Sequence, residues 1–323
     1  MNSHHKRLVA DVGGTNTRIA LYESGTGEFR ATHTYTNRDF EKFEDVVESW
    51  LDNLDEEKPD NGCIAVAAPP SADTVVMSNM DWVFSSKSVS RRFGFKRFQW
   101  INDFVAVAYA LPFLRDTDRH QLYSAATTSA GDTTCAKLAG LGPGTGLGGA
   151  TIESVNQQLH PVACEPGQMS LAPKSELEFA LFRHLAKTHE TIFTELLVSG
   201  PGLLRIYQGL CEVKGEQPKP RSPQQISSIA QSHANTTDEQ ALAMFCGLLG
   251  SVAGDFVLAN GSYGGLYLAG GIVPGFIDYL ATSDFHARFC EKGTMKKHME
   301  SVPVYVITAP QPGLIGAAHA PFS

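Results

Sequence analysis

The chain has 323 residues, of which 42% are hydrophobic and 19% are charged, as in an ordinary globular protein and unlike a disordered or membrane-embedded one. This length favours two domains, and it is sufficient to bury a core without disulfide or metal support. Asp and Glu outnumber Lys and Arg by 34 to 26, and no long basic run occurs, which argues against nucleic acid as a partner because phosphate backbones require a positive face.

The cysteines and the apolar segments favour a cytoplasmic protein. The six cysteines lie far apart, with no CxxC or Cys/His cluster, which argues against a zinc site and for reduced thiols. No apolar signal core precedes the first predicted strand. Residues 241–258 nearly reach the length of a membrane span, but they contain Asp255 and several glycines and lack flanking basic anchors. We therefore predict a buried helix there and no membrane association.

The first part of the chain alternates predicted strands and helices. Residues 7–23 have the pattern of a strand, a tight glycine turn and a second strand, and another strand is predicted at 30–36. Apolar spacing predicts a helix over 40–54, followed by a buried strand at 63–69 and a short helix at 88–93. A strand over 97–102 ends at Asp103, and a helical pattern then runs from 105 to about 112.

A long polar stretch, residues 115–134, separates this part from the next, so we place a domain boundary at about residue 112. The second part begins with strands predicted at 136–142 and 150–155 on either side of a glycine turn. Helices are predicted around 176–189, 201–210 and 239–258, and strands at 265–271 and 303–309. Residues 312–320 are predicted to form a helix that returns to the first domain. The predicted domains are therefore 1–112 completed by 305–323, and 113–304.

A faint internal repeat links the two parts. A shift of 130 positions aligns residues 8–20 with residues 138–150 and matches Leu8 with Leu138, Gly14 with Gly144, Thr15 with Thr145 and Ala20 with Ala150. Two related α/β halves that each begin with strand, Gly/Thr turn and strand would present both turns to one ligand.

The two glycine turns are either plain turns or phosphate cradles. Residues 144–149 fit GxGxxG, but the following residues have a β pattern, whereas a dinucleotide fingerprint requires a helix there. No P-loop sequence occurs. Each turn carries a Thr hydroxyl beside its glycines, and Asp11 directly precedes the first turn, where a carboxylate could hold Mg²⁺ or simply cap the turn.

Three ordered motifs resemble those of a known superfamily. D-V-G-G-T-N at 11–16, L-G-P-G-T-G-L-G at 141–148 and L-A-G-G-I-V-P at 268–274 look like the two phosphate motifs and the adenosine motif of the hexokinase/actin superfamily. More narrowly, residues 8–319 resemble the bacterial glucokinase family. The resemblance implies a two-domain α/β sugar kinase/actin-like (ribonuclease H-like) fold with a ligand cleft between the domains. It also implies ATP-dependent, Mg²⁺-dependent phosphorylation of glucose at its 6-hydroxyl, in a homodimer.

The same resemblance implies which residues contact ATP. Asp11 would hold Mg²⁺, and the other expected nucleotide contacts come from all three motifs: Gly13, Gly14, Thr15, Asn16, Gly144, Thr145, Gly270 and Gly271.

A candidate base lies where a hydrophobic strand ends. Asn102 and Asp103 close the strand predicted at 97–102, at the carboxyl edge where ligands of α/β sheets bind. A helix follows, so an Asn-Asp helix cap is the alternative reading. Because Asn102-Asp103-Phe104 resembles the family's N-D-F motif, it implies that Asp103 is the general base for the 6-hydroxyl and that Asn102 binds a neighbouring hydroxyl.

Further sugar contacts follow from the resemblance, with one departure. Glu165 begins the stretch E-P-G-Q, Glu195 precedes S-G-P-G at 199–202, and Gly146 is placed with the sugar contacts. The family's stretch is E-G-G-H, so Gln168 stands where the family has histidine, and Pro166 stiffens the loop. Because hydroxyl-binding sites discriminate sharply, we expect a sugar specificity that is broader than, or shifted from, strict glucose use.

Three alternatives stay open from the sequence. The chain could phosphorylate another hexose such as mannose or glucosamine, serve as a catalytically idle sugar sensor, or form actin-like filaments. Retention of Asp11, Asn102 and Asp103 argues against the sensor, and the paired sugar-site glutamates argue against the filament.

Overall fold

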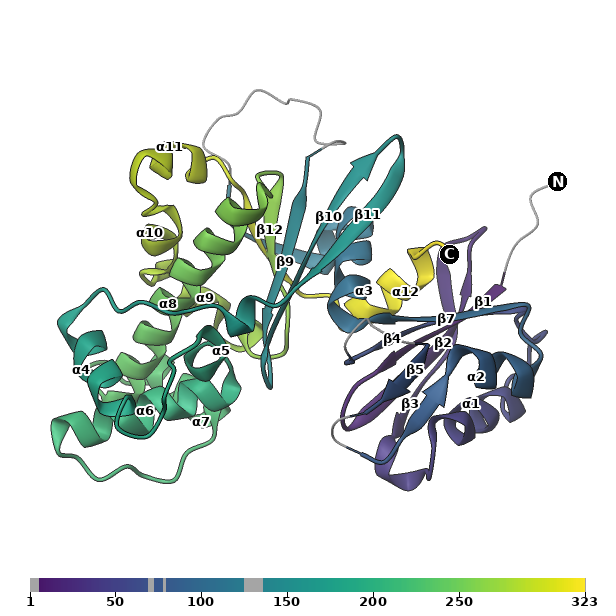
Figure 1. Cartoon of the computed structure of the whole chain (residues 1–323), viewed down its shortest axis with the longest axis horizontal. Helices are drawn as coiled ribbons and strands as arrows, with labels where there is room; N and C mark the ends of the chain where they lie inside the picture. The colour runs from purple at the N-terminus through teal and green to yellow at the C-terminus, as the bar shows by residue number, and fades with distance from the viewer. Residues whose placement is uncertain (1–5, 69–72, 78–79, 125–135, 323) are drawn as a thin grey trace. The chain divides into compact units, whose positions relative to one another are not determined.

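The chain forms two compact units in the computed structural model, which describes residues 6–68, 73–77, 80–124 and 136–322 (Figure 1). The first unit comprises Met1–Leu114 and Ala309–Ser323, and the second comprises Arg115–Thr308. From the sequence we predicted that the chain returns to the first domain between residues 304 and 305. The structural division falls after residue 308 because strand β13 (Val304–Ile307) pairs within the sheet of the second unit.

The first unit is built on a five-stranded sheet in the order β3-β2-β1-β4-β7. Strands β1 (Lys6–Val12), β2 (Asn16–Glu23) and β3 (Glu28–Thr36) form an antiparallel meander. Strands β4 (Asn61–Val66) and β7 (Arg97–Asn102) continue the sheet in parallel with β1. A separate hairpin pairs β5 (Thr74–Val76) with β6 (Val83–Ser85). The carboxyl ends of β1, β4 and β7 therefore share one edge.

Helices cover both faces of this sheet because alternate residues of β1 face opposite sides. Leu8, Ala10 and Val12 pack in one core with α1 (Phe43–Asp52) and α2 (Ser86–Phe93). On the other face lie α3 (Asp103–Ala110) and α12 (Pro312–His319). These two helices cross so closely that a Cβ added at Gly316 would overlap the carbonyl oxygen of Ala106.

The second unit repeats this topology. Its sheet has the order β11-β10-β9-β12-β13-β8. Strands β9 (Leu138–Pro143), β10 (Leu147–Val155) and β11 (Gln158–Cys164) form the antiparallel meander, and β12 (Gly265–Leu268) and β13 run parallel to β9. Strand β8 (Arg119–Tyr123) adds an antiparallel edge. The strand order supports the repeat suspected from the 130-residue shift, because β1 corresponds to β9 and β2 to β10.

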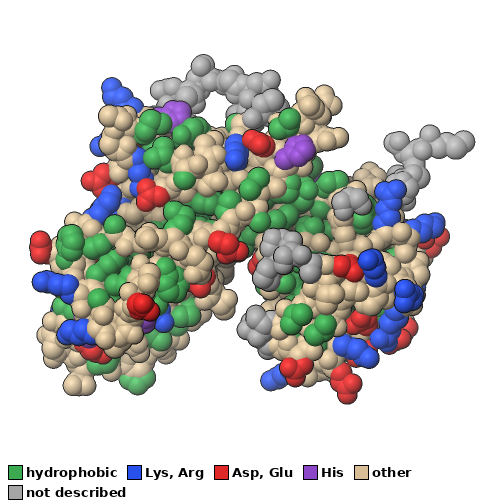
Figure 2. Space-filling view, in the orientation of Figure 1, with side chains coloured by type: hydrophobic (Ala, Val, Ile, Leu, Met, Phe, Trp, Pro, Cys, Tyr) green, Lys and Arg blue, Asp and Glu red, His purple; other side chains and the backbone are tan. Residues whose placement is uncertain are grey.

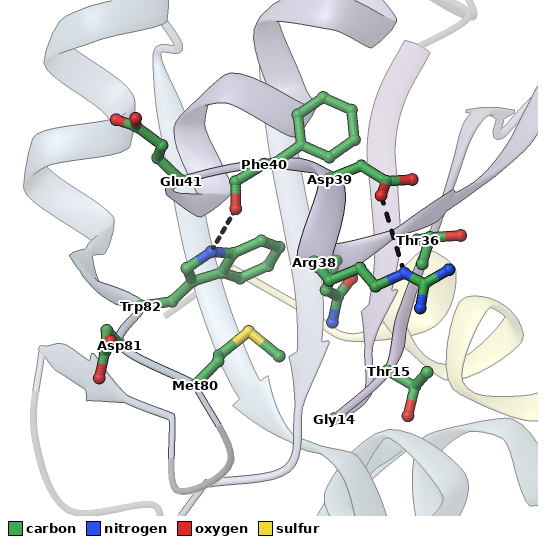
Figure 3. Close-up of a pocket in the computed structure, with 11 residues that line it drawn as sticks. Gly14, Thr15, Thr36, Arg38, Asp39, Phe40, Glu41, Met80, Asp81 and Trp82 are labelled. Atoms are coloured by element: carbon green, nitrogen blue, oxygen red, sulfur yellow. Dashed lines mark hydrogen bonds and ion pairs between the residues drawn. The ribbon is translucent and has the colours of Figure 1, made fainter.

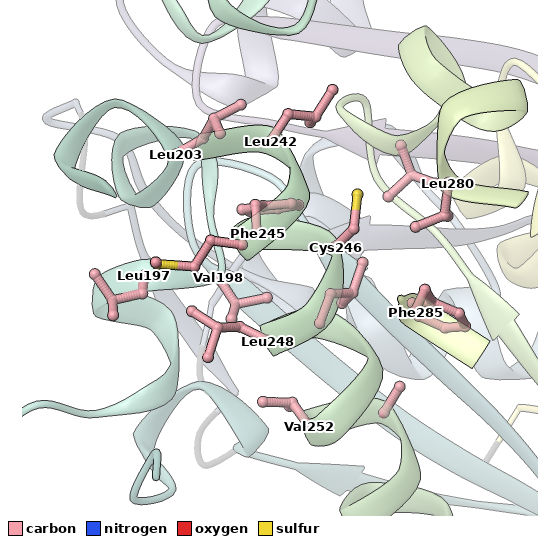
Figure 4. Packing of buried hydrophobic residues seen from close by; sticks show 14 of the residues in the cluster. Leu197, Val198, Leu203, Leu242, Phe245, Cys246, Leu248, Val252, Leu280 and Phe285 are labelled. Atoms are coloured by element: carbon pink, nitrogen blue, oxygen red, sulfur yellow. The ribbon is translucent and has the colours of Figure 1, made fainter. Parts of the chain in front are cut away.

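A long central helix, α8 (Thr237–Asn260), organises the core of the second unit. Within the described residues it is the one helix whose length and composition would allow it to cross a membrane, and 83% of its apolar window is buried. Figure 4 shows Phe245, Cys246 and Leu248 of α8 among apolar neighbours from other elements, including Phe285. It is a buried core helix, as its glycines and Asp255 predicted.

The remaining helices of the second unit surround α8. They are α4 (Glu176–Leu185), α5 (Thr194–Leu197), α6 (Gly200–Lys214), α7 (Pro223–Ser232), α9 (Ile277–Thr282), α10 (Phe285–Cys290) and α11 (Lys296–Met299).

Charged side chains of both signs are intermixed on the visible face of the first unit (Figure 2). Arg92 of α2, for example, pairs with Asp45 and Glu48 of α1 at 3.5 and 2.7 Å. Exposed pairs of this kind contribute little to stability but leave no field of one sign across these two helices.

Candidate active site

The first glycine turn, residues 13–16, joins the ends of β1 and β2 at the centre of the sheet. The N–H of Gly13 donates to the carbonyl oxygen of Asn16 at 3.0 Å, while Gly14 and Thr15 are exposed. Neither Gly13 nor Gly14 has a positive φ, so left-handed backbone does not explain these glycines. Their effect is to leave the backbone of the turn uncovered by side chains, as close approach of an anion requires.

Asn37, which the sequence analysis did not single out, anchors this turn. It begins the short 3-10 helix η1 (Asn37–Asp39) and is only 2% exposed. Its N–H donates to the oxygen of Thr15 at 2.9 Å, and its Nδ2 donates to the oxygen of Gly13 at 2.8 Å. Because this polar stretch has no recognisable motif, only the tertiary contacts reveal the residue.

Beside the turn the first unit has a cavity of about 720 Å³. Figure 3 shows Gly14 and Thr15 on its wall together with Arg38, Met80 and Trp82. A volume of this size is within the range of small-molecule sites.

Asp11 lies next to this turn, near the end of β1 and on the face that α12 covers. A Cβ added at Gly313, in the first turn of α12, would lie 2.8 Å from the carboxyl carbon of Asp11, so the helix start packs directly on the carboxylate. Burial raises the pKa of Asp11, and the nearby guanidinium of Arg18 partly offsets this.

The chemistry around Asp11 fits a Mg²⁺ ion held together with a phosphate. Mg²⁺ keeps several waters and is commonly bound by one or two carboxylates plus substrate phosphates. The described residues contain no group of three or more His, Cys, Asp or Glu side chains that could form an all-protein site. One partly buried carboxylate beside an uncovered glycine turn matches a Mg²⁺ ion bound by a carboxylate and substrate phosphates.

Asn102 and Asp103 form the junction between β7 and α3. The Asn102 side chain caps the helix, because its Oδ1 accepts the N–H groups of Phe104 and Val105 at 2.9 and 3.2 Å. Its Nδ2 donates to the oxygen of Ala68 at 3.1 Å and to Oδ1 of Asp103 at 2.9 Å. The cap alternative thus describes Asn102, whose amide has protein partners on both sides.

The Asp103 carboxylate is held at this junction through Oδ1 alone. Oδ1 also accepts the N–H of Phe104 at 3.0 Å, and no other residue among those described donates to Oδ2. The pKa of Asp103 is raised to about 6, because burial and the nearby Asp11 carboxylate outweigh the hydrogen bonds from the N–H groups of Phe104 and Asp103 itself and from Asn102, which lower it. A partly buried carboxylate with a pKa near neutrality has the properties of a general base.

In the second unit, Glu195 of α5 brings two of the predicted segments together. Its Oε2 accepts the N–H of Leu147 at 2.8 Å, directly after the second glycine turn. A Cβ at Gly146 would lie 2.5 Å from that oxygen, and one at Gly167 would lie 3.0 Å from it. The carboxylate therefore contacts both the glycine turn and the Glu165–Gln168 stretch.

The Glu165–Gln168 stretch forms a tight turn around the helix η5 (Pro166–Gln168). Pro166 and Gly167 are buried, whereas Glu165 and Gln168 are exposed and their side chains have no hydrogen-bond partner within the described residues. The stretch thus presents one carboxylate and one amide to solvent beside Glu195.

The second glycine turn is supported from two directions. The N–H of Gly144 donates to the oxygen of Gly146, and the N–H of Gly200, at the start of α6, donates to the oxygen of Gly144, both at 2.8 Å. Gly270 has φ +90°, and a Cβ there would overlap the oxygen of Pro143, so the position requires glycine. Gly271 beside it has open space, and Thr145 is exposed.

Comparisons with known proteins show which family the chain resembles. The family model described as Glucokinase matches residues 8–321. The glucokinase of Saccharophagus degradans is 36% identical over 314 residues, 96% of each chain. That of Psychromonas ingrahamii is 39% identical over 310 residues, 96% of this chain and 95% of its own.

Solved structures show the same relation. The crystal structure of a glucokinase from an Antarctic psychrotroph is 35% identical, covers 98% of both chains and superposes with a TM-score of 0.87. A ROK family glucokinase from Streptomyces griseus, solved with glucose and AMPPNP, has a TM-score of 0.64 at 17% identity over 97% of this chain and 98% of its own. The latter likeness concerns the fold, which is the sugar kinase/actin-like one.

The raised pKa of Asp103 predicts a pH-dependent gain of stability in Asp103→Asn. From about pH 4 to about pH 6 the carboxyl is protonated in the folded protein but ionised in the unfolded one. The ionised group therefore destabilises the folded state above about pH 6, and this effect is absent below about pH 4. The variant should therefore unfold at a higher temperature than the parent at pH 7.5, with the difference vanishing at pH 4. Calorimetry at both values measures it, and an equal difference at both would contradict the burial of a charged Asp103.

Proposed function

The chain belongs to the glucokinase family and catalyses ATP-dependent phosphorylation of glucose. We propose the following catalytic and binding roles for its residues. Asp103 is the general base for the 6-hydroxyl. The turn at residues 13–16 receives ATP phosphates, as does the turn at Gly144 and Thr145, while Gly270 and Gly271 border the adenosine. Gly146, Glu165, Gln168 and Glu195 contact the sugar, and Asn102, whose amide is hydrogen-bonded within the protein, exchanges one of those bonds for a sugar hydroxyl.

The observation that carries the proposal is the state of the Asp103 carboxylate. Its pKa of about 6 leaves it ionised at neutral pH yet a stronger base than an ordinary aspartate. As the sugar's O6 forms a bond to the γ-phosphorus, its proton passes to the carboxylate and the bond from that phosphorus to the β,γ-bridging oxygen breaks to release ADP. Asn102 and the Phe104 N–H hold Oδ1, so Oδ2 is the atom that takes the proton.

Asp11 is proposed to hold Mg²⁺ together with the phosphates at the neighbouring turn. The ion, when bound, neutralises charge on the phosphoryl oxygens. The chain's own part is to fix the carboxylate through the close packing of Gly313 and to leave the turn's N–H groups uncovered. Local positive potential matters in a protein of net charge −8.

In the second unit, Glu195 uses Oε2 to hold the N–H of Leu147 and keeps Oε1 for a sugar hydroxyl. Gly146 and Gly167 are small because the carboxylate lies against both. Glu165 and Gln168 add one acceptor group and one group that both donates and accepts, which suits adjacent hydroxyls.

We further propose that the protein works in the cytoplasm as a homodimer. Cys63, Cys164, Cys211, Cys246 and Cys290 are free, which suits a reducing compartment; Cys135 lies outside the described residues. Dimerisation rests on the resemblance to the family alone.

Asp103→Asn should lower kcat by about 10²- to 10⁴-fold, because the amide cannot take the proton. The parent's kcat/KM for glucose should also fall below about pH 6, as Asp103 becomes protonated, and this acid limb should be absent from the residual activity of the variant. Coupled ADP release against pH measures both. A variant with unimpaired turnover would remove Asp103 from the role of base.

Gln168→His should narrow the sugar specificity. The neutral amide donates and accepts flexibly, so we expect the parent to turn over mannose or glucosamine detectably beside glucose, and the imidazole to raise the preference for glucose about 10-fold. ADP release across the three sugars, with Gln157→His on an exposed turn as the control, measures this. If the parent turns over glucose alone, or the preference is the same in both proteins, Gln168 does not set specificity.

A further inference from the structure

A single asparagine connects the first glycine turn to the segment that follows β3. Asn37 makes three hydrogen bonds toward the turn and the start of β2, and it is 2% exposed. Its N–H and Nδ2 donate to the oxygens of Thr15 and Gly13, and its Oδ1 accepts the hydroxyl of Thr17 at 2.8 Å. The residue therefore contacts the turn from its buried side.

The partners determine how the Asn37 amide is oriented. The carbonyl oxygen of Gly13 can only accept, so Nδ2 must face it, and Oδ1 then faces the Thr17 hydroxyl. Thr17 is itself fully buried, and this hydroxyl is paired. A buried amide with both ends paired holds one geometry, because a shift of the turn would leave polar groups unsatisfied.

This geometry determines where the turn's N–H groups point. In a trans peptide the carbonyl and the next N–H point in opposite directions, so drawing the Gly13 oxygen toward Asn37 directs the Gly14 N–H away from it. No acceptor for the N–H of Gly14 or of Thr15 is found among the described residues, and both residues are exposed. The unpaired N–H of Gly14 thus points away from Asn37, in a part of the turn that is open to solvent.

We propose that Asn37 is a positioning residue for ATP: by holding the Gly13 carbonyl oxygen inward it presents the Gly14 N–H to the phosphates, and by holding the Thr15 oxygen it fixes the other end of the turn. This inference rests on the proposed function of the turn as a phosphate site. Arg38, the next residue, is 87% exposed at its side chain and lines the cavity that Gly14 and Thr15 also line. Loss of the Asn37 contacts would allow both the turn and Arg38, on the adjoining wall of the cavity, to move.

The test compares Asn37→Ala with Asn260→Ala. Asn260, at the end of α8 in the second unit, also donates its Nδ2 to a backbone oxygen, that of Phe256 at 2.9 Å, so its variant controls for the loss of a comparable amide bond. Calorimetric titration with AMPPNP and with glucose gives both dissociation constants, and thermal unfolding gives the folded fraction. Asn37→Ala should weaken AMPPNP binding about 5- to 30-fold, the loss of one or two hydrogen bonds, with glucose binding changed less than about twofold.

A second variant covers the case in which Asn37→Ala fails to fold. Asn37→Asp keeps the shape and the acceptor for Thr17 but sets a carboxylate oxygen against the Gly13 oxygen and beneath the phosphates. It should weaken AMPPNP binding more than alanine does. A purely structural role predicts instead that both ligands weaken equally, or that the AMPPNP affinity changes no more than in Asn260→Ala; either result overturns the inference.

Amide NMR tests the positioning role of Asn37 separately from the proposal that the turn at residues 13–16 binds the ATP phosphates. In the parent protein, addition of AMPPNP should shift the resonances of Gly14 and Thr15. If neither shifts, the turn is not the phosphate site and both ideas fail. If both shift but the Asn37 variants bind AMPPNP with the parent's affinity, only the positioning role is wrong.

Discussion

The first unit is arranged around two partly buried carboxylates at one edge of its sheet, Asp11 near the end of β1 and Asp103 directly after β7, with β4 between these strands. Desolvation raises the pKa of both Asp11 and Asp103, and the Asp11 carboxylate raises the pKa of Asp103 further. Close packing keeps them in place. Gly313 lets the start of α12 reach Asp11, and Gly316 lets the same helix lie against α3, whose first residue is Asp103. A larger side chain at either glycine would push the helix away and let water reach the carboxylates.

The second unit also holds a carboxylate, that of Glu195, beside its glycine turn, but through different contacts. Glu195, in the first turn of α5, is held by one backbone N–H and lies against two glycines that leave room for it. In both units a glycine turn lies beside a positioned carboxylate, in a sheet with the same order of strands. This repeated plan suits phosphoryl transfer, in which placement and charge stabilisation matter more than covalent chemistry by the protein.

Local sequence patterns predicted the helices and strands that bury apolar residues. They did not predict features that depend on contacts between residues far apart in the sequence. The strand before Asp103 and the helix α8 were predictable because their apolar runs have clear periods. Strand β8 was missed because it is a polar edge strand, stabilised by contacts such as that of Arg119 with the hydroxyl of Tyr267. Asn37 has no local signal at all, since its role arises only when β3 brings it beneath the turn. The cap formed by Asn102 was visible in sequence as an alternative, and the structure gives that amide a defined partner on each side.

The most direct test of this account is the pKa of Asp103 itself. The carbon-13 resonance of its carboxyl group, followed by NMR from pH 3.5 to 8 in the ligand-free protein and assigned with Asp103→Asn, reports the titration of this one group. The account predicts a midpoint near pH 6, because burial and Asp11 outweigh the hydrogen bonds to Oδ1. A midpoint near 4, the value of an exposed aspartate, would contradict it, since the carboxylate would then be solvated and too weak a base for the proposed step.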